Sequence, residues 1–277
     1  MAEEEPINAE GTLLRKLQLC ELEILREFVR ICTKYELRYF LVGGTLLGAV
    51  RHQGFIPWDD DIDVAMLRED YDEFAKIAQV EFGETYFYQD YNTDPHYFLS
   101  YAKIRKNGTE VYEERFKNSQ FHKGVFIDIF PLDYCPKPSL FTHFLFNVLA
   151  VMNYRGQVDS GEEYNPYDEL IGKLGWEVLK IFSKSQTIKL RKNLILFGKF
   201  IGKQTYIASY SGAYGYKREV FPLAAYDKLH HTLFCEELYS VPIKYDLYLT
   251  QIYGGNYMRL PEKSDRHTHI NVNFISI

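Results

Sequence analysis

Four aspartates are crowded into five positions early in the chain: Asp59, Asp60, Asp61 and Asp63. Residues 61–64 alternate between acidic and apolar side chains, which predicts a β-strand carrying the carboxylates of Asp61 and Asp63 on one face. Carboxylates this close repel one another unless a cation or a proton relieves the repulsion. Two carboxylates on one edge suit Mg²⁺, which takes a few carboxylate oxygens together with water and substrate phosphates. The cluster therefore predicts metal and phosphate chemistry.

A pair of glycines, Gly43 and Gly44, follows a short apolar strand predicted over 39–42. Because glycine has no Cβ, such a turn lets backbone N–H groups come close to a phosphate. Thr45 is expected to cap the next helix, predicted over 46–51, so that the helix N-terminus faces the same ligand. Gly43, Gly44 and Thr45 are therefore the predicted phosphate-binding residues.

Four further side chains are candidate substrate-binding residues because of their charge or their place near the aspartates: Arg51, His52, Trp58 and Lys103. Each has a structural alternative. The basic residues could be ordinary surface charges, and Trp58 could simply pack in the core.

Asp128 is a lone carboxylate in the strand predicted over 124–130, where every neighbouring side chain is apolar. A buried carboxylate needs a partner, because its desolvation is costly. Asp128 is therefore either a metal ligand or a structural aspartate with an ion-pair partner.

The acidic stretch has two alternative interpretations, and the glycine pair has one. The acidic stretch could be a solvated acidic loop, but Trp58 and the apolar alternation on either side argue against this. It does not fit a calcium loop, because position 6 of that motif would be Val64 in place of glycine. Neither G-x-G-x-x-G nor G-K-[ST] accompanies Gly43 and Gly44, so dinucleotide and P-loop motifs are absent.

Composition narrows the class of protein. The 277 residues, 46% of them hydrophobic, suffice for one large domain or two small ones. The net charge of −6 disfavours nucleic-acid binding, and an anionic substrate would need a local positive site or a metal. The four cysteines form no C-x-x-C pair, which indicates reduced thiols. Neither a signal peptide nor a run of ~20 apolar residues is visible, so we expect an intracellular protein.

Periodicity predicts an α-helix over 12–35, where apolar residues recur at steps of three and four, and another over 69–81 with an acidic first turn. Further strand-like segments and a final helix are expected at these positions: 86–89, 97–105, 206–235 and 245–253. The chain shows no internal repeat.

Residues 139–203 differ in composition from the rest of the chain. An apolar helix is predicted over 139–152 and a polar loop over 153–167, and 173–203 holds eight basic residues against one acidic residue. A basic amphipathic stretch is typical of a helix that binds a membrane surface or an anionic partner. The alternative is a core helix pair with a solvated basic rim.

Three segments carry a family resemblance: GGTLLGAVRHQGFIPWDDDID, GVFIDIFPLD and YGGNYMRLP. They resemble the LicD family of choline phosphotransferases, relatives of the fukutin-type enzymes, and the resemblance spans residues 12–269. It implies an α+β fold with a nucleotidyltransferase-like mixed β-sheet, flanking helices and a helical insertion. The implied division is a catalytic core over 1–138, the insertion over 139–203, and a segment over 204–277 that completes the same domain.

The resemblance also implies roles for the residues. The glycine loop would be Gly43-Gly44, and Mg²⁺ (or Mn²⁺) would be held by Asp61, Asp63 and Asp128. Asp59 could add a further ligand, and Asp128 could take the proton of the acceptor.

The implied reaction moves phosphocholine from CDP-choline to a hydroxyl of a cell-surface glycan precursor, of teichoic acid or lipopolysaccharide type, and releases CMP. The acceptor is expected to be lipid-linked, and the enzyme cytoplasmic, with peripheral contact to the inner face of the plasma membrane through 139–203. Trp58 is the only aromatic residue that we predict to contact the choline group.

Other functions stay open. The transferred group could be another CDP-linked one, such as ribitol phosphate or phosphoethanolamine. The protein could also be a true nucleotidyltransferase or a D-x-D glycosyltransferase, although glycosyltransferases place D-x-D after a full nucleotide-binding half, later than Asp61. A non-catalytic binding module is disfavoured, because it has no use for carboxylates beside a glycine loop.

Overall fold

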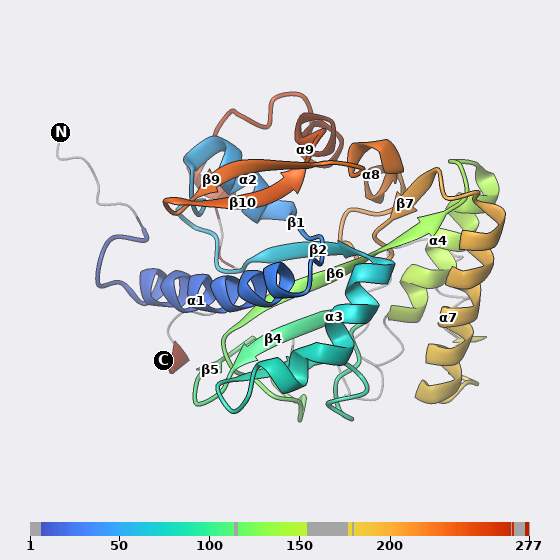
Figure 1. Ribbon diagram of the computed structural model, residues 1–277, viewed down its shortest axis with the longest axis horizontal. Coiled ribbons are helices and arrows are strands. Elements are labelled where there is room, and N and C mark those ends of the chain that lie inside the picture. Colours follow the sequence, from blue (N-terminus) through green and yellow to red (C-terminus); the bar gives the residue numbers. More distant parts are fainter. Residues whose placement is uncertain are drawn as a thin grey trace.

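The computed structural model describes residues 7–113, 116–153, 177–178, 180–266, 268 and 275–276, and a mixed β-sheet lies at its centre (Figure 1). Five strands follow one another across the sheet in this order: β1 (Phe40–Leu41), β2 (Asp63–Leu67), β6 (Phe126–Cys135), β4 (Ala102–Lys106) and β3 (Tyr86–Gln89). Strands β2 and β6 are parallel, and the other neighbouring pairs are antiparallel. Two short antiparallel strands extend the sheet from the end of β6: β7 (Tyr206–Ala208) and β8 (Val220–Pro222).

Helices surround this sheet (Figure 1). Two of them pack against its central strands: α1 (Leu13–Lys34) and α3 (Arg68–Glu81). Two helices and a hairpin gather around β1: α2 (Gly43–His52), α9 (Tyr245–Tyr253), and β9 (Leu229–Phe234) with β10 (Glu237–Pro242). Two more helices pair beside the end of β6: α4 (Leu140–Asn153) and α7 (Lys184–Ile201). The short elements are α8 (Tyr216–Glu219), η2 (Leu223–Ala225), η3 (Lys263–Asp265), and β5 (Glu110–Val111) paired with β11 (Ile275–Ser276).

Helix α1 forms because its apolar side chains recur on one side and its first turn is capped. The hydroxyl of Thr12 accepts the backbone N–H of Arg15 at 3.2 Å. Leu17, Ile24 and Phe28 are fully buried beneath the helix. Burying side chains of this size stabilises the fold by about 1.5–3 kcal/mol each, so α1 is held mainly by its apolar face.

The α+β fold class predicted from the sequence is confirmed. The helices predicted over 12–35, 69–81 and 245–253 agree with α1, α3 and α9 to within one residue at each end. These are the segments with the clearest period of 3.6, or with clear end signals.

Strand β6 runs five residues beyond its predicted end at residue 130, through Pro131. A proline removes one backbone donor and is tolerated in a sheet only where no ladder bond is lost. Here Pro131 lies between Ile129, the last residue paired with β4, and Asp133, the first paired with β7. The strand can therefore continue through it.

The predicted insertion is a packed helix pair where the structure describes it. Helix α4 confirms the apolar helix expected over 139–152. Its Leu145, Phe146 and Leu149 are buried together with Ile195 of α7 in a second apolar core. This packing agrees with the core-helix alternative for the inner side of the pair.

Most of the polar loop expected over 153–167 lies outside the described residues, as does the first part of the basic stretch. The division at residues 138 and 204 stays a prediction. Among the described helices, none combines the length and the apolar character needed to cross a bilayer.

Candidate active site

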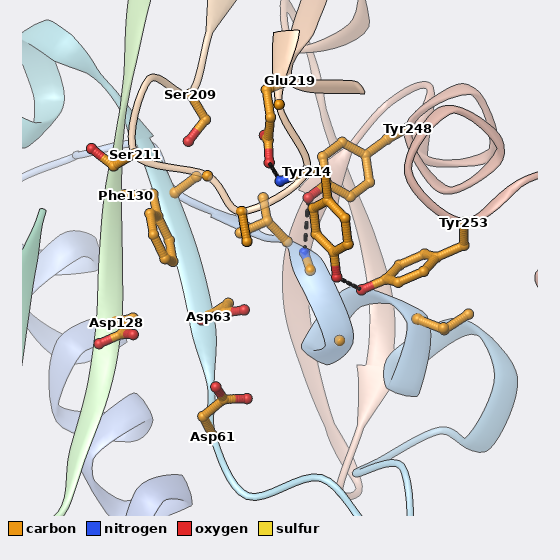
Figure 2. Close-up of a pocket in the computed structure, with 18 of the residues that line it drawn as sticks. Asp61, Asp63, Asp128, Phe130, Ser209, Ser211, Tyr214, Glu219, Tyr248 and Tyr253 are labelled. Atoms are coloured by element: carbon orange, nitrogen blue, oxygen red, sulfur yellow. Dashed lines mark hydrogen bonds between the residues drawn. The ribbon is translucent and has the colours of Figure 1, made fainter. Parts of the chain in front are cut away.

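A pocket of about 1070 Å³ lies where α2, β2, β6 and α9 meet. Asp63 and Asp128 line it from the sheet and Asp61 from just before β2, and the segment 209–215 and Tyr253 line it from the opposite side. Figure 2 shows these acidic and aromatic side chains around one cavity. A cavity of this size accommodates a nucleotide-sized ligand.

The two glycines pack directly against the carboxylates. A Cβ built at Gly43 would lie 2.5 Å from Oδ2 of Asp63, and one at Gly44 would lie 2.8 Å from Oδ2 of Asp59. Gly43 also has φ of +56°, a conformation that residues with a side chain rarely adopt. The close backbone approach predicted from the sequence is therefore present, and only glycine allows it. The N–H of Gly43 donates to the hydroxyl of Tyr248 at 2.9 Å.

The structure corrects the prediction for Thr45. Helix α2 begins at Gly43, and Val42 occupies the N-cap without a side-chain hydrogen bond, so Thr45 does not cap the helix. Thr45 is 2% exposed, and its hydroxyl accepts the backbone N–H of Asp63 at 2.8 Å. The hydroxyl thus fastens the start of β2 to α2. Thr45 is absent from the pocket lining, so we assign it the positioning of Asp63 in place of phosphate contact.

Parallel pairing brings the predicted carboxylates together. Asp63 of β2 is in register with Asp128 of β6, and the N–H of Asp128 donates to the carbonyl of Ile62 at 2.8 Å. Strand β2 begins only at Asp63, so the strand predicted from Asp61 is wrong for its first two residues, and Asp61 lies just before the sheet. Burial, and then the charges of Asp61, Asp128 and Asp59, raise the pKa of Asp63 well above its usual value. Such repulsion is what a bound cation would relieve.

Lys103 is the partner that the buried Asp128 requires. Its Nζ lies 2.5 Å from Oδ1 of Asp128 and 3.3 Å from the centre of the Phe126 ring. Lys103 is fully buried and does not line the pocket. Lys103 therefore lies behind Asp128, where it balances one negative charge of the site. The prediction that it contacts the substrate is wrong, because it does not reach the pocket.

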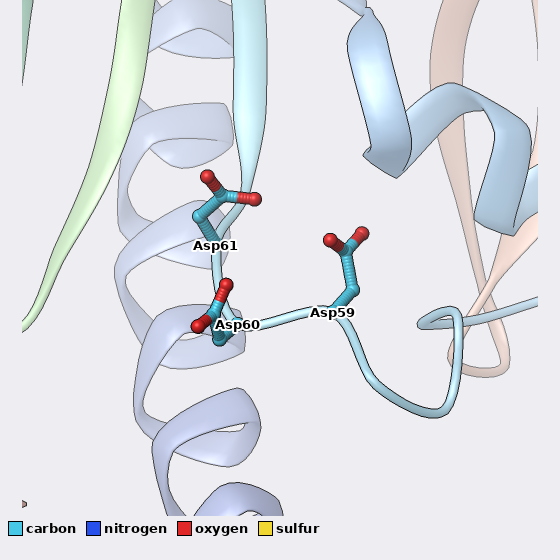
Figure 3. Close-up of side chains that lie close together, drawn as sticks. All are labelled: Asp59, Asp60 and Asp61. Carbon is cyan, nitrogen blue, oxygen red and sulfur yellow. The ribbon is translucent and has the colours of Figure 1, made fainter. Parts of the chain in front are cut away.

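The three consecutive aspartates before β2 form a compact group of oxygen donors. Asp59, Asp60 and Asp61 can each offer a carboxylate oxygen within 4.8 Å of the others (Figure 3). Asp60 is fully buried and lies outside the pocket lining, whereas Asp59 and Asp61 line the pocket. Clustered carboxylate oxygens are the ligands that Mg²⁺ and Mn²⁺ prefer. These clustered oxygens fit a divalent cation, and those of Asp59 and Asp61 are offered at the pocket edge.

Glu21 of α1 adds an acidic group that the sequence-based prediction missed. It is fully buried, and neither carboxylate oxygen has a hydrogen-bond partner among the described residues. Burial, followed by the charges of Asp61, Asp60 and Asp59, raises the pKa of Glu21 well above its usual value. The sequence could have revealed this burial, because Glu21 comes four residues after Leu17 and so lies on the apolar face of the helix.

Arg51, His52 and Trp58 lie near one another, with the ring centres of His52 and Trp58 6.5 Å apart. Their contact with substrate stays a prediction. Arg51 Nη1 donates to the carbonyl of Tyr257 at 2.9 Å, and its Nε donates to Nε2 of His52 at 2.9 Å. Burial lowers the pKa of both groups, and the charge of Arg51 lowers that of His52 further. Arg51 and Trp58 line the pocket, and His52 does not. The guanidinium of Arg266 lies 4.9 Å from the Trp58 ring centre, so this ring already has a cation beside it.

Glu219 is a second acidic group that the sequence-based prediction missed. It ends α8, is 4% exposed and lines the pocket opposite the aspartates (Figure 2). Its Oε1 accepts the N–H of Tyr214 at 3.2 Å. Burial raises the pKa of Glu219 to about 7. Sequence analysis missed Glu219 because residues 206–235 show only a high tyrosine content. No spacing in the sequence indicates that α8 and α9 meet beside the glycine pair.

This raised pKa predicts a pH-dependent stability. The folded state holds the Glu219 proton more tightly than the unfolded state, so its contribution is full below pH ~4.5 and is lost as the pH rises through about 7. Glu219→Gln should therefore gain roughly 3 kcal/mol relative to wild type between pH 4.5 and pH 8. Urea unfolding at both pH values measures this. The exposed Glu84→Gln is the control, and equal pH dependence of wild type and Glu219→Gln would contradict the assignment.

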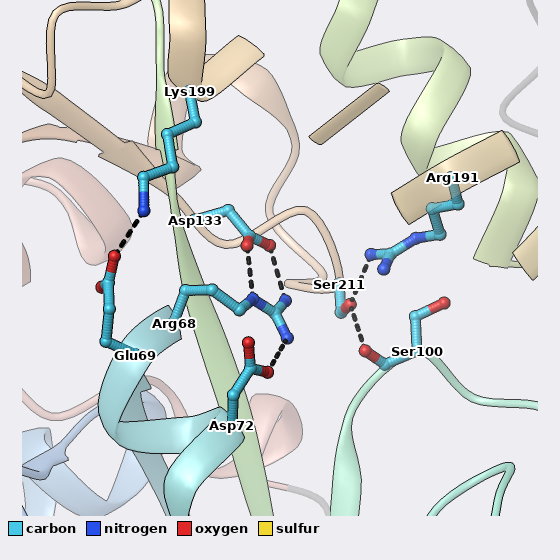
Figure 4. A network of polar contacts seen from close by, with 8 residues as sticks. All are labelled: Arg68, Glu69, Asp72, Ser100, Asp133, Arg191, Lys199 and Ser211. Carbon is cyan, nitrogen blue, oxygen red and sulfur yellow. Dashed lines mark hydrogen bonds and ion pairs between the residues drawn. The ribbon is translucent and has the colours of Figure 1, made fainter. Parts of the chain in front are cut away.

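A polar network holds the pocket wall to α7 (Figure 4). Arg191 Nη2 donates to the hydroxyl of Ser211 at 3.3 Å, and that hydroxyl donates to the carbonyl of Ser100 at 3.4 Å. Burial lowers the pKa of Arg191 to about 10. Nearby, Arg68 forms two hydrogen bonds to Asp133, of 2.6 and 2.9 Å. The prediction that the basic residues of 173–203 face a membrane or an anionic partner is wrong for Arg191, because its side chain points inward to Ser211.

Comparison with known proteins places this geometry in context. The family profile described as "LicD/FKTN/FKRP, nucleotidyltransferase domain" matches residues 36–156. The lipopolysaccharide cholinephosphotransferase LicD of Haemophilus influenzae is 32% identical over 263 residues, which cover 92% of this chain and 95% of that protein. The human ribitol 5-phosphate transferase FKRP is 40% identical over 68 residues, 23% of this chain and 14% of that protein. An uncharacterized protein of Rickettsia prowazekii is 27% identical over 157 residues, covering 56% and 53% of the two chains.

Proposed function

This chain belongs to the LicD family, and we propose that it transfers phosphocholine from CDP-choline to a hydroxyl of a cell-surface glycan precursor, releasing CMP. It is a phosphotransferase: both LicD of Haemophilus influenzae and human FKRP carry names that describe transfer of a phospho-group. Our proposal adds that the donor is CDP-linked and that the acceptor is of lipopolysaccharide or teichoic acid type.

The observation that carries the proposal is the contact between the glycine turn and the carboxylates. Gly43 and Gly44 lie against Asp63 and Asp59, and Asp63 is paired in register with Asp128. A ligand diphosphate in this pocket would meet carboxylates suited to a metal on one side and the N-terminus of α2 on the other. Phosphoryl transfer needs this kind of positioning and charge stabilisation more than it needs a protein nucleophile.

We propose Mg²⁺ (or Mn²⁺) as the cofactor, held by Asp61, Asp63 and Asp128 with Asp59 alongside. A bound divalent ion supplies charge neutralisation for the diphosphate and for the transferred group. Lys103 pairs with Asp128 on the far side and balances part of the negative charge of the site. Thr45 holds the Asp63 backbone in place.

In the proposed reaction the acceptor oxygen bonds to the phosphorus of phosphocholine while that phosphorus releases its bridging oxygen to CMP. In this proposal Asp128 takes the acceptor proton. The N-terminal amides of α2 and the positive end of its dipole would stabilise the phosphates. Arg51 lines the same pocket and holds the segment that follows α9 through the carbonyls of Tyr257 and Arg259.

Donor and product analysis tests this function. The protein is incubated with Mg²⁺, glycan acceptors from cells that lack phosphocholine, and one donor at a time: CDP-choline, CDP-ethanolamine or CDP-ribitol. We expect CMP and a phosphocholine-bearing glycan. The match to FKRP makes ribitol phosphate the second candidate group. A nucleotide-bearing product would indicate a true nucleotidyltransferase, and a nucleoside diphosphate would indicate a glycosyltransferase.

We further propose that the acceptor is lipid-linked and that the protein meets the membrane at one end of the α4–α7 pair. The rings of Phe141 and Phe197 contact each other there, with centres 6.4 Å apart. The exposed apolar side chains at this end are Leu140, Phe141, Phe144, Phe197, Phe200 and Ile201. Lys137 and Lys203 are exposed beside them and suit anionic lipid.

Replacing Phe144 and Phe200 together by serine should weaken binding to phosphatidylglycerol vesicles by about tenfold or more, because about 60% and 86% of these residues is exposed. Vesicle sedimentation at low salt measures the effect. Val80→Ser is the matched control, since Val80 is 83% exposed on α3. If wild type ignores the vesicles, or the double variant binds as wild type does, the membrane proposal is wrong.

A further inference from the structure

Glu219 is a buried carboxylate held at the pocket wall by neutral groups. The segment 209–215 packs onto it, and a Cβ at Gly212 would lie 2.1 Å from its Oε1. Its Oε1 accepts a hydrogen bond from the backbone N–H of Tyr214. In the described part of the chain, no lysine, arginine or histidine forms an ion pair with it. A carboxylate so placed is stabilised in its charged form only when a cation enters the pocket.

Aromatic side chains surround the same part of the pocket. The hydroxyls of Tyr214 and Tyr253 are hydrogen-bonded at 3.1 Å, and their ring centres are 5.6 Å apart at 76°. The hydroxyl of Tyr248 accepts a hydrogen bond from the N–H of Gly43, and the ring of Tyr248 stacks on Phe221. Because these hydroxyls are engaged, the rings have mainly aromatic surface left for a ligand. We call this group the aromatic–acidic wall, and its members are Tyr214, Glu219, Tyr248 and Tyr253 (Figure 2).

The wall begins where the proposed phosphate site ends. Tyr248 contacts Gly43, and Gly43 packs against Asp63. In a choline phosphate ester the charged nitrogen is only a two-carbon link away from the phosphate. A donor with its phosphates at the glycine turn would therefore place a short cationic group at this wall.

We infer that the aromatic–acidic wall binds the quaternary ammonium group of the donor, an inference that rests on the proposed function. A trimethylammonium group has no N–H to donate, so aromatic faces and a full negative charge are what recognise it. A neutral polyol such as ribitol would need hydrogen-bonding partners and would leave Glu219 without a cation. The wall thus favours a cationic head group over a neutral one.

Among Glu219 and the three tyrosines that face it, only Glu219 changes its charge near neutral pH. Tyr214 comes from the 209–215 segment, Tyr226 follows η2, and Tyr248 lies on α9. Burial raises the pKa of all three tyrosines, that of Tyr214 to about 12, so they stay neutral. A bound cation favours ionised Glu219, and the affinity for a cationic donor should rise as the pH increases through about 7.

Calorimetry with two donors that share the same diphosphate tests the wall: CDP-choline and CDP-glycerol, each with Mg²⁺. We expect wild type to bind CDP-choline at least about tenfold tighter. Glu219→Gln and Tyr253→Leu should each remove most of this preference, while Tyr253→Phe, which keeps the ring, should retain it. Unchanged affinity for CDP-glycerol shows that the variants are folded. In wild type, the affinity for CDP-choline should increase from pH 6 to pH 8 and that for CDP-glycerol should not.

Three results would overturn the inference while the proposed function stands. The first is phosphocholine transfer by wild type without any preference for CDP-choline over CDP-glycerol. The second is an unchanged preference in both Glu219→Gln and Tyr253→Leu. The third is a Glu219→Gln enzyme that keeps its donor affinity but loses turnover, which would place Glu219 in the chemical step. If wild type transfers another group and no phosphocholine, the inference and the proposed function both fail.

Discussion

Asp63→Asn should lower kcat by about a thousandfold or more while the protein stays folded. Asp63 lies at the centre of the site: it is in register with Asp128, its N–H is held by Thr45, and its carboxylate touches Gly43. Asparagine keeps the shape and removes the charge, so the proposed contact between Asp63 and the metal is lost without opening a cavity. Initial rates of CMP release from CDP-choline measure the effect.

The same variant should be at least as stable as wild type when metal is absent. The pKa of Asp63 is raised by burial and by neighbouring carboxylates, so its ionisation destabilises the fold as the pH rises. We expect the Tm of Asp63→Asn in chelator at pH 8 to equal or exceed that of wild type. Added Mg²⁺ should raise the Tm of wild type and have little effect on the variant.

Asp72→Asn is the control, because Asp72 lies on α3 outside the pocket lining. Near-normal turnover in Asp63→Asn would remove Asp63 from the proposed centre. An equal Mg²⁺-induced rise in Tm in both proteins would show that the ion binds elsewhere.

Gly43→Ala should reduce kcat/KM by about a hundredfold or more, because one methyl group strikes the carboxylate on which the site depends. The added Cβ would lie 2.5 Å from Oδ2 of Asp63, so either the turn or the carboxylate must move. The left-handed φ of +56° adds a backbone penalty of about 1–2 kcal/mol. Gly44→Ala should act in the same direction through Asp59, which would lie 2.8 Å away.

The chain offers a matched control for the backbone penalty. Gly83 has φ of +55°, and a Cβ there would meet nothing within 4 Å. Gly83→Ala should therefore lose similar stability and keep wild-type kcat/KM. Melting curves and steady-state kinetics on the two variants separate strain from displacement of Asp63. If Gly43→Ala keeps full activity, close packing of the turn on the carboxylates is not needed for the reaction.

Local patterns in the sequence were enough to predict the framework of the site. Alternation correctly placed Asp63 on a strand, although it also placed Asp61 there and β2 begins only at Asp63. An apolar strand isolated Asp128, and the glycine pair indicated a close backbone approach. Helices α1, α3 and α9 followed from periodicity and end signals. These features depend on neighbours within a few residues, so a single chain reveals them without its tertiary structure.

The side-chain partners were decided only by the tertiary structure. Thr45 binds the backbone of Asp63, and Lys103 lies buried behind Asp128, because the parallel pairing of β2 and β6 fixes which groups face each other. Arg191 turns inward because α7 packs beside Ser211.

The two acids missed by sequence reasoning show the same limit. Glu21 and Glu219 acquire their raised pKa values from burial, which helix packing creates and no local spacing encodes. Residue types and short-range spacing therefore indicated the chemistry of this protein. The electrostatic environment of each group was set by contacts between segments far apart in the chain, because burial and charge proximity are properties of the assembled fold.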